Sequence, residues 1–127
     1  MSAALALEPQ QFIVVVEDDA GMKKAIERLL RAAGFQPVSF ASAEELLQTE
    51  AADYAACLVL DIHLPGISGL ELGRLLTSRR VRPIIFITAQ DEARLRYEAE
   101  RLGCVYFRKP FEGKALLEAI RQAIKLN

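Results

Sequence analysis

Acidic residues follow two strongly apolar segments of this chain. The acidic stretch 17–19 comes directly after the apolar run 12–16, and Asp61 comes directly after the run 55–60. Carboxylates that meet in one crevice repel each other and disfavour ionisation, unless a divalent cation binds among them. Oxygen ligands from only two or three protein groups suit Mg²⁺, which keeps several waters and often binds a phosphate oxygen.

Two other apolar runs end in groups that complement a carboxylate. Thr88 and Ala89 follow the run 83–87, and Lys109 follows the run 104–107 after one arginine. Lys109 supplies a compact positive charge and Thr88 a hydroxyl donor. Phosphoryl transfer to a carboxylate needs a metal, an ammonium and a hydroxyl around it, because the transferred group carries negative charge on three oxygens. Asp61 is then the expected nucleophile, forming a mixed anhydride.

These groups need a scaffold that brings the ends of several strands together. The expected strands are the runs 12–16, 36–40, 55–60, 83–87 and 104–107, and a helical pattern follows each of them. Ser42 and Ser68 each open a helix with a glutamate three residues later. The alternation predicts an α/β fold with a five-stranded parallel sheet, order 2-1-3-4-5, and helices on both faces. Ligands of such folds bind at the carboxyl ends of the strands, where the strand order switches.

The composition is that of a globular domain. The chain has 127 residues, of which 52% are apolar and 26% charged, with a net charge of −1. This balance predicts no non-specific contact with nucleic acid or membranes, and no apolar run approaches the roughly 18 residues of a membrane span. We expect one domain over residues 12–127 after an N-terminal lead-in, residues 1–11, that lacks signal-peptide features. Cys57 and Cys104 are expected as two buried thiols, which fits a cytoplasmic protein.

Four stretches at the expected strand ends form one pattern. They are VVEDD (15–19), VLDIHLPGISGLE (59–71), PIIFITA (83–89) and YFRKPF (106–111). Together and in this order they resemble the response-regulator receiver family of two-component signalling, and the resemblance covers nearly the whole chain. The stretches SFASAEEL (39–46) and GLEL (69–72) are most similar to the branch of nitrogen-fixation and nodulation regulators.

The resemblance implies a Mg²⁺ site around a phosphoacceptor. It makes Asp61 the phosphoacceptor, and Glu17 and Asp18 the acidic pair, with Asp18 binding the metal directly and Glu17 through water. The backbone carbonyl of His63 is the implied third protein ligand, and Mn²⁺ can substitute for Mg²⁺. Asp19 is instead expected to be the N-cap of the first helix.

The resemblance also assigns the residues that bind and sense the phosphoryl group. Lys109 is implied to pair with Asp61 or a phosphoryl oxygen, while Thr88 and the amide of Ala89 bind the phosphoryl group. Thr88 and Tyr106 are the implied switch, in which Thr88 moves inward and Tyr106 leaves an exposed rotamer to fill the space.

Two features depart from the usual family pattern. The segment between Gly103 and Tyr106 is one residue shorter, so the loop before the last strand is expected to differ. His63 is not the commonest residue two positions after the acceptor. His63 and Gln90 flank the site and are expected to tune hydrolysis of the acyl phosphate.

The implied partners are proteins. A histidine kinase or phosphotransfer protein supplies the phosphoryl group. An unidentified downstream target binds the surface of the fourth expected helix (Leu95 to Leu102), the fifth strand (104–107) and the fifth helix (Leu116 to Ile124), which can also support a homodimer. The chain is implied to be a signalling domain that gains and loses its own phosphate, not a metabolic enzyme. Two alternatives stay open: a non-phosphorylated pseudo-receiver used only for interaction, and a flavodoxin-like cofactor binder, whose phosphate-binding loop would stand where 17–19 is acidic.

Overall fold

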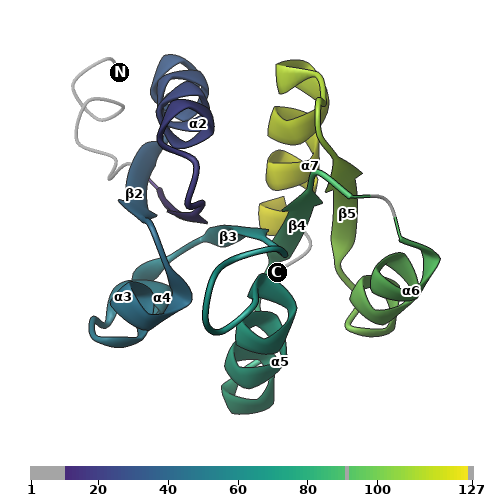
Figure 1. Ribbon diagram of the computed structural model, residues 1–127. Helices are drawn as coiled ribbons and strands as arrows, with labels where there is room; N and C mark the ends of the chain where they lie inside the picture. Colours follow the sequence, from purple (N-terminus) through teal and green to yellow (C-terminus); the bar gives the residue numbers. More distant parts are fainter. Residues whose placement is uncertain (1–10, 91, 126–127) are drawn as a thin grey trace.

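The predicted strands form one parallel sheet in the order β2-β1-β3-β4-β5, which confirms the predicted α/β fold (Figure 1). The computed structural model describes residues 11–90 and 92–125. The strands are β1 (Phe12–Val16), β2 (Gln36–Phe40), β3 (Cys57–Asp61), β4 (Ile84–Thr88) and β5 (Val105–Arg108). β1 pairs with β3 on one side and β2 on the other, so the strand order switches between β1 and β3. A ligand site is expected at the carboxyl ends of these two strands.

The helices divide between the two faces of the sheet. They are α2 (Ala20–Ala32), α3 (Ala43–Leu47), α4 (Ala51–Tyr54), α5 (Gly69–Arg79), α6 (Ala93–Arg101) and α7 (Gly113–Lys125). α2 and α7 cover one face, and α3 to α6 cover the other (Figure 1). Successive strand residues point to opposite faces, so Val14 packs in one core and Val15 in the other. Burial on both faces explains why the central strands read as unbroken apolar runs.

Three strands begin and end one or two residues later than the sequence analysis predicted. The polar residues Asp61, Thr88 and Arg108 belong to the strands instead of following them, because they still pair across the sheet. Asp61 is in register with Ile87, and Thr88 with Arg108. The backbones of Asp61 and Thr88 are therefore fixed by the parallel ladder itself.

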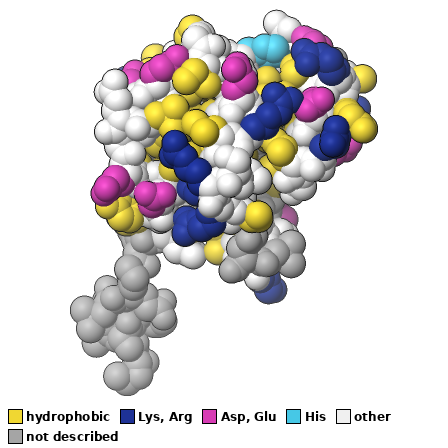
Figure 2. Space-filling model, turned by 90° about the horizontal axis from the view of Figure 1, so that it is seen from below, with side chains coloured by type: hydrophobic (Ala, Val, Ile, Leu, Met, Phe, Trp, Pro, Cys, Tyr) yellow, Lys and Arg dark blue, Asp and Glu magenta, His cyan; other side chains and the backbone are white. Residues whose placement is uncertain are grey.

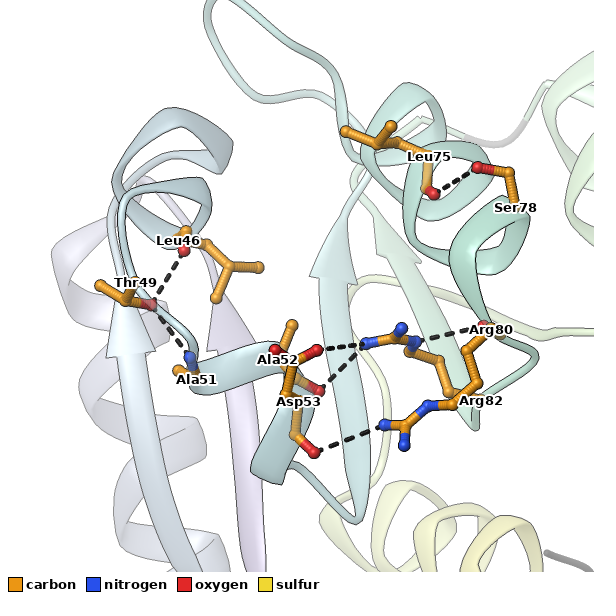
Figure 3. A network of polar contacts seen from close by, with 9 residues as sticks. All are labelled: Leu46, Thr49, Ala51, Ala52, Asp53, Leu75, Ser78, Arg80 and Arg82. Atoms are coloured by element: carbon orange, nitrogen blue, oxygen red, sulfur yellow. Dashed lines mark hydrogen bonds and ion pairs between the residues drawn. The ribbon is translucent and has the colours of Figure 1, made fainter.

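The single helix predicted after Ser42 is in fact two short helices, α3 and α4. The Ser42 hydroxyl accepts a hydrogen bond from the Glu45 amide at 3.1 Å, as its predicted capping role requires. The break follows from Thr49, whose hydroxyl donates to the Leu46 carbonyl at 2.9 Å and accepts from the Ala51 amide at 3.1 Å. Thr49 thus satisfies the end of α3 and the start of α4 with one side chain (Figure 3).

A buried arginine ties α4 to the segment that enters β4. The Arg82 side chain donates from Nη1 to the Ala52 carbonyl at 3.1 Å and from Nε to the Arg80 carbonyl at 3.2 Å (Figure 3). Asp53 lies 3.9 Å from the same guanidinium. Burial lowers the pKa of Arg82, and these acceptors offset the cost of removing its charge from water. Nothing in the hydrophobic pattern indicates that this arginine is buried.

The remaining fold-level predictions have mixed outcomes. Cys57 is buried as predicted, but Cys104 is only half-buried because it precedes β5. The lead-in predicted for residues 1–11 lies almost wholly outside the described residues. Among the helices of the described ranges, none combines the length and apolar character that crossing a bilayer requires. On the face shown in Figure 2, Lys and Arg side chains are interspersed with Asp and Glu side chains, in line with the small net charge.

Candidate functional site

Three carboxylates gather at the carboxyl ends of β1 and β3. Glu17, Asp18 and Asp61 each place an oxygen within 4.8 Å of the other two. Glu17 is fully buried and Asp61 is 3% exposed, whereas Asp18 is exposed. The β1–β2 ladder continues past its last residue, because the Glu17 amide donates to the Phe40 carbonyl at 3.0 Å. Two buried carboxylates and one exposed one thus converge at one edge of the sheet, as the sequence predicts.

Lys109, which directly follows β5, places a positive charge beside this carboxylate cluster. Its ammonium lies 2.6 Å from Oε1 of Glu17 and 3.5 Å from Oδ2 of Asp61. The Lys109 amide donates to the Thr88 carbonyl at 2.7 Å, and the peptide bond to Pro110 is cis. Burial alone would lower the pKa of Lys109, but the hydrogen bond to Glu17 and the nearby carboxylates outweigh it and raise the pKa. The side chain is therefore a stable cation.

Asp61 is held in an environment that disfavours its charge. Burial, followed by the hydrogen bond and the negative charge of Glu17, raises the pKa of Asp61 to about 7. Lys109 and the His63 amide, which donates to Oδ1 at 3.2 Å, act in the opposite direction. Two of the three carboxylates contact the Lys109 ammonium, so the cluster holds more acidic groups than cations. Hard oxygen donors with this excess charge fit a divalent cation such as Mg²⁺.

The fourth acidic residue has a different role, as predicted. The Asp19 side chain accepts a hydrogen bond from the Met22 amide at 2.8 Å and so caps the N-terminus of α2. Its own amide donates to Oε2 of Glu17 at 3.1 Å. Asp19 therefore fixes the start of α2 and orients Glu17 without belonging to the three-carboxylate cluster.

Close packing behind Asp61 explains a glycine of the following helix. The Gly69 amide donates to the Ile62 carbonyl at 2.9 Å. A Cβ on Gly69 would overlap the carbonyl oxygen of Asp61. The β3–α5 loop (residues 62–68) thus returns tightly to the strand end that carries Asp61. Ser68 and Glu71 form the capping box that the sequence predicts at the start of α5.

The end of β4 connects the site to β5 through a chain of hydrogen bonds. The Thr88 hydroxyl, fully buried, accepts from the Gln90 amide at 3.1 Å. The Gln90 carbonyl accepts from the Tyr106 hydroxyl, also at 3.1 Å. The Tyr106 ring is half-buried and packs against the core on the face that α3 to α6 cover. The Arg96 guanidinium of α6 lies 5.7 Å from the centre of this ring.

Sequence reasoning located the carboxylates, Thr88 and Lys109, but it missed several residues that position them. It gave no role to Arg96, or to Glu44, whose Oε2 accepts a hydrogen bond from the Ile67 amide at 2.9 Å. It also did not foresee that Gln90 links Thr88 with Tyr106. Each of these contacts joins residues that are far apart in sequence or uses a backbone group. No periodic pattern or motif could have indicated them.

Comparison with known proteins places this geometry in a family. The family model described as the response regulator receiver domain matches residues 13–121. Nodulation protein W of Bradyrhizobium diazoefficiens is 41% identical over 110 residues, which cover 85% of this chain and 48% of that protein. The transcriptional regulatory protein FixJ of the same species is 36% identical over 115 residues, covering 89% of this chain and 56% of that protein. The solved structure of the response regulator StyR is 39% identical with a TM-score of 0.84, covering 94% of this chain and 61% of that one.

The chain belongs to the response-regulator receiver family. This result confirms the resemblance in the sequence and favours a signalling domain over a flavodoxin-like cofactor binder. The chain spans about half the length of these curated relatives. The part of each relative that matches this chain is the receiver, so family membership describes this domain alone.

Proposed function

We propose that this chain, over residues 12–127, is a phosphoacceptor receiver in which Asp61 takes a phosphoryl group from a histidine kinase or phosphotransfer protein. One observation carries the proposal: the Asp61 carboxylate is buried beside Glu17, Asp18 and Lys109 at the point where the strand order switches. A carboxylate that served only structure would gain nothing from two acidic neighbours, since they raise the cost of its charge.

The chemistry is a displacement at phosphorus. A carboxylate oxygen of Asp61 forms the new P–O bond while the bond to the donor's leaving group breaks, and the leaving group departs with its electron pair. Only the ionised form of Asp61 is a nucleophile. Because the pKa of Asp61 is raised to about 7, a nearby cation has a large effect on how much of the carboxylate is ionised.

Glu17, Asp18, Asp61 and the backbone carbonyl of His63 would hold the Mg²⁺, and Mn²⁺ can replace it. When bound, the metal supplies positive charge to the phosphoryl oxygens and to the acidic cluster. Asp18 is exposed and is the direct ligand in this assignment. Glu17 is engaged by Lys109 at 2.6 Å, which supports an indirect role through water.

Three groups are assigned to the oxygens of the transferred phosphoryl group. Lys109 lies close enough to Asp61 to bind one oxygen with little movement. The Thr88 hydroxyl accepts from Gln90, which leaves its own hydrogen available for donation to a phosphoryl oxygen. The Ala89 amide, next in the chain, is the third donor. Together they stabilise charge that develops on the transferred group.

Signal output is assigned to the surface of α6, β5 and α7. If Thr88 turns toward the phosphoryl group, its hydrogen bond with the Gln90 amide is strained, and Gln90 also holds Tyr106. The position of the Tyr106 ring then depends on phosphorylation, which biases one surface state over the other. A downstream protein, or a second copy of this chain, binds the favoured state. We place this exchange in the cytoplasm, which suits the free thiols of Cys57 and Cys104.

The proposal is tested by phosphorylating the purified chain with acetyl phosphate and following the intact mass. We expect one phosphoryl group to be gained with Mg²⁺, little gain with EDTA, and none for Asp61→Asn. The matched control is Asp53→Asn, an exposed carboxylate outside the site that should leave phosphorylation unchanged. A wild-type chain that gains nothing with Mg²⁺ would instead support the pseudo-receiver alternative.

A further inference from the structure

Glu44, in the first turn of α3, reaches the loop that follows the phosphoacceptor strand. Its Oε2 accepts a hydrogen bond from the Ile67 amide at 2.9 Å, across 23 residues of sequence. This hydrogen bond, followed by one from the residue's own amide, lowers the pKa of the Glu44 carboxyl. The acceptor is therefore charged at neutral pH, which makes the hydrogen bond stronger than one between neutral groups.

The neighbouring residue, Gly66, also lies against the Glu44 carboxylate. Gly66 has a φ of 75°, a backbone conformation that other residues rarely adopt. A Cβ on Gly66 would overlap Oε2 of Glu44. The loop therefore fits the Glu44 carboxylate at two consecutive residues, one through a donor and the other through the absence of a side chain.

Backbone hydrogen bonds and a capping box hold the two ends of the β3–α5 loop, while the side chains of Leu64 and Ile67 pack into the core. At its start, the Ile62 amide donates to the Ile87 carbonyl at 2.8 Å, and at its end the Ser68–Glu71 capping box begins α5. Within the described ranges, the bond from Glu44 is the only hydrogen bond that joins the backbone of residues 64–67 to another helix or strand. The hydrogen bond to Glu44 thus fixes the backbone of a loop whose Leu64 and Ile67 side chains pack into the core.

We propose that Glu44 is a positioning residue for the metal site, holding the loop so that the His63 carbonyl keeps the orientation that Mg²⁺ binding needs. The inference rests on the proposed function, because His63 is a metal ligand only there. Glu44 touches neither the acceptor nor the metal ligands. It acts through the backbone of the loop that carries one of them, as groups behind metal ligands commonly do.

Three variants separate the hydrogen bond from the charge. Glu44→Ala removes both the acceptor and the charge, and Glu44→Gln removes the charge but keeps an acceptor oxygen. Glu45→Ala is the matched control, since Glu45 is exposed on the same turn and its side chain contacts the Ser42 hydroxyl instead of the β3–α5 loop. For each variant, Mg²⁺ and Mn²⁺ dissociation constants are measured by calorimetry, and stability by urea unfolding in EDTA. Because Glu44 is exposed, all three variants are expected to fold.

We expect Glu44→Ala to weaken Mg²⁺ binding by about five-fold, while Glu44→Gln and Glu45→Ala stay close to wild type. The urea midpoints should differ little among the variants. A residue that merely stabilised the fold would instead lower stability without a selective loss of Mg²⁺ affinity. Amide exchange of Ile67 should be faster in Glu44→Ala than in wild type.

The inference is overturned if Glu44→Ala binds Mg²⁺ as wild type does, or if Glu44→Gln loses as much affinity as Glu44→Ala. The first outcome would show that Glu44 does not affect Mg²⁺ binding. The second would show that its effect comes from its charge and not from its hydrogen bond to the Ile67 amide. Failure of the proposed function has a different signature, since wild type itself would then bind no Mg²⁺ and gain no phosphoryl group on Asp61.

Discussion

The Lys109 ammonium lies 2.6 Å from Oε1 of Glu17 and 3.5 Å from Oδ2 of Asp61, so it is bound more closely to the acidic neighbour than to the acceptor. The sequence analysis paired Lys109 with Asp61 or a phosphoryl oxygen and did not foresee the contact with Glu17. This contact has a consequence for the metal. Lys109 and a divalent cation compete for the same negative charge, although both favour the arrival of a phosphoryl group.

Replacing Lys109 with methionine is therefore expected to have opposite effects on two measurements. Lys109→Met keeps most of the side-chain volume and removes the ammonium from Glu17. Calorimetry should then show Mg²⁺ binding that is about 3-fold tighter than in wild type. Phosphorylation by acetyl phosphate should slow by about 100-fold, because one stabilising charge on the phosphoryl oxygens is lost. Lys114→Met, an exposed lysine at the start of α7, is the control. Weaker Mg²⁺ binding in Lys109→Met would contradict the competition.

Asp61 should make the metal-free protein less stable as the pH rises. The pKa of Asp61 is raised to about 7 in the folded chain, above the unfolded value near 4. The contribution of Asp61 to the free energy of unfolding is therefore full below about pH 4 and is lost as the pH rises through 7. Asp61→Asn should therefore be more stable than wild type at pH 8 in EDTA, by about 2 kcal/mol. Urea unfolding at several pH values measures the difference.

Two further observations check the pH prediction. The stability advantage of Asp61→Asn should shrink toward pH 4, and Mg²⁺ should stabilise wild type at pH 8 much more than it stabilises the variant. Glu112→Gln, which replaces an exposed carboxyl beside the start of α7 and outside the acidic cluster, is the control variant. A constant difference between Asp61→Asn and wild type from pH 4 to pH 8 would mean that the acceptor is not held in a charge-disfavouring site.

Gly69 should tolerate no side chain. A Cβ on Gly69 would overlap the Asp61 carbonyl, so Gly69→Ala must move either α5 or the phosphoacceptor strand. We expect a loss of about 2–3 kcal/mol in urea unfolding and much slower phosphorylation. Gly21→Ala is the control, because its Cβ would meet only Oδ2 of Asp19 at an ordinary 3.5 Å, and a helical alanine should be neutral or slightly stabilising. Equal effects of both variants would deny the special constraint at Gly69.

Tyr106→Phe tests the link between the site and β5. The change removes the hydroxyl that donates to the Gln90 carbonyl and keeps the ring under Arg96. Stability should fall by at most about 1 kcal/mol, since the bond is partly exposed to water. Amide exchange at Gln90 and in α6 should become faster, as measured by NMR, while Tyr97→Phe should leave Gln90 unchanged. Unaltered exchange in Tyr106→Phe would remove Tyr106 from the proposed relay.

The sequence could predict the sheet and the acidic cluster because both depend on short-range signals. Runs such as 12–16 and 83–87 are rich in apolar β-branched residues, and the carboxyl ends of parallel strands must share one edge, which brings Glu17 and Asp61 together. The contacts of Arg82, Glu44 and Thr49 could not be predicted in the same way. In each contact a side chain is hydrogen-bonded to a backbone group. Because every residue has the same backbone groups, no sequence pattern indicates which residue is the partner.

The central claim, that Asp61 carries the phosphoryl group, is tested most directly by trapping the acyl phosphate. Borohydride reduces an aspartyl phosphate to homoserine with release of phosphate, so the modified position can be read by peptide mass spectrometry after phosphorylation with acetyl phosphate and Mg²⁺. We predict homoserine at position 61 and unreduced side chains at positions 17, 18 and 19, with little conversion when Mg²⁺ is replaced by EDTA. Conversion at another carboxylate, or no conversion at position 61 in a chain that has gained phosphate, would contradict the account.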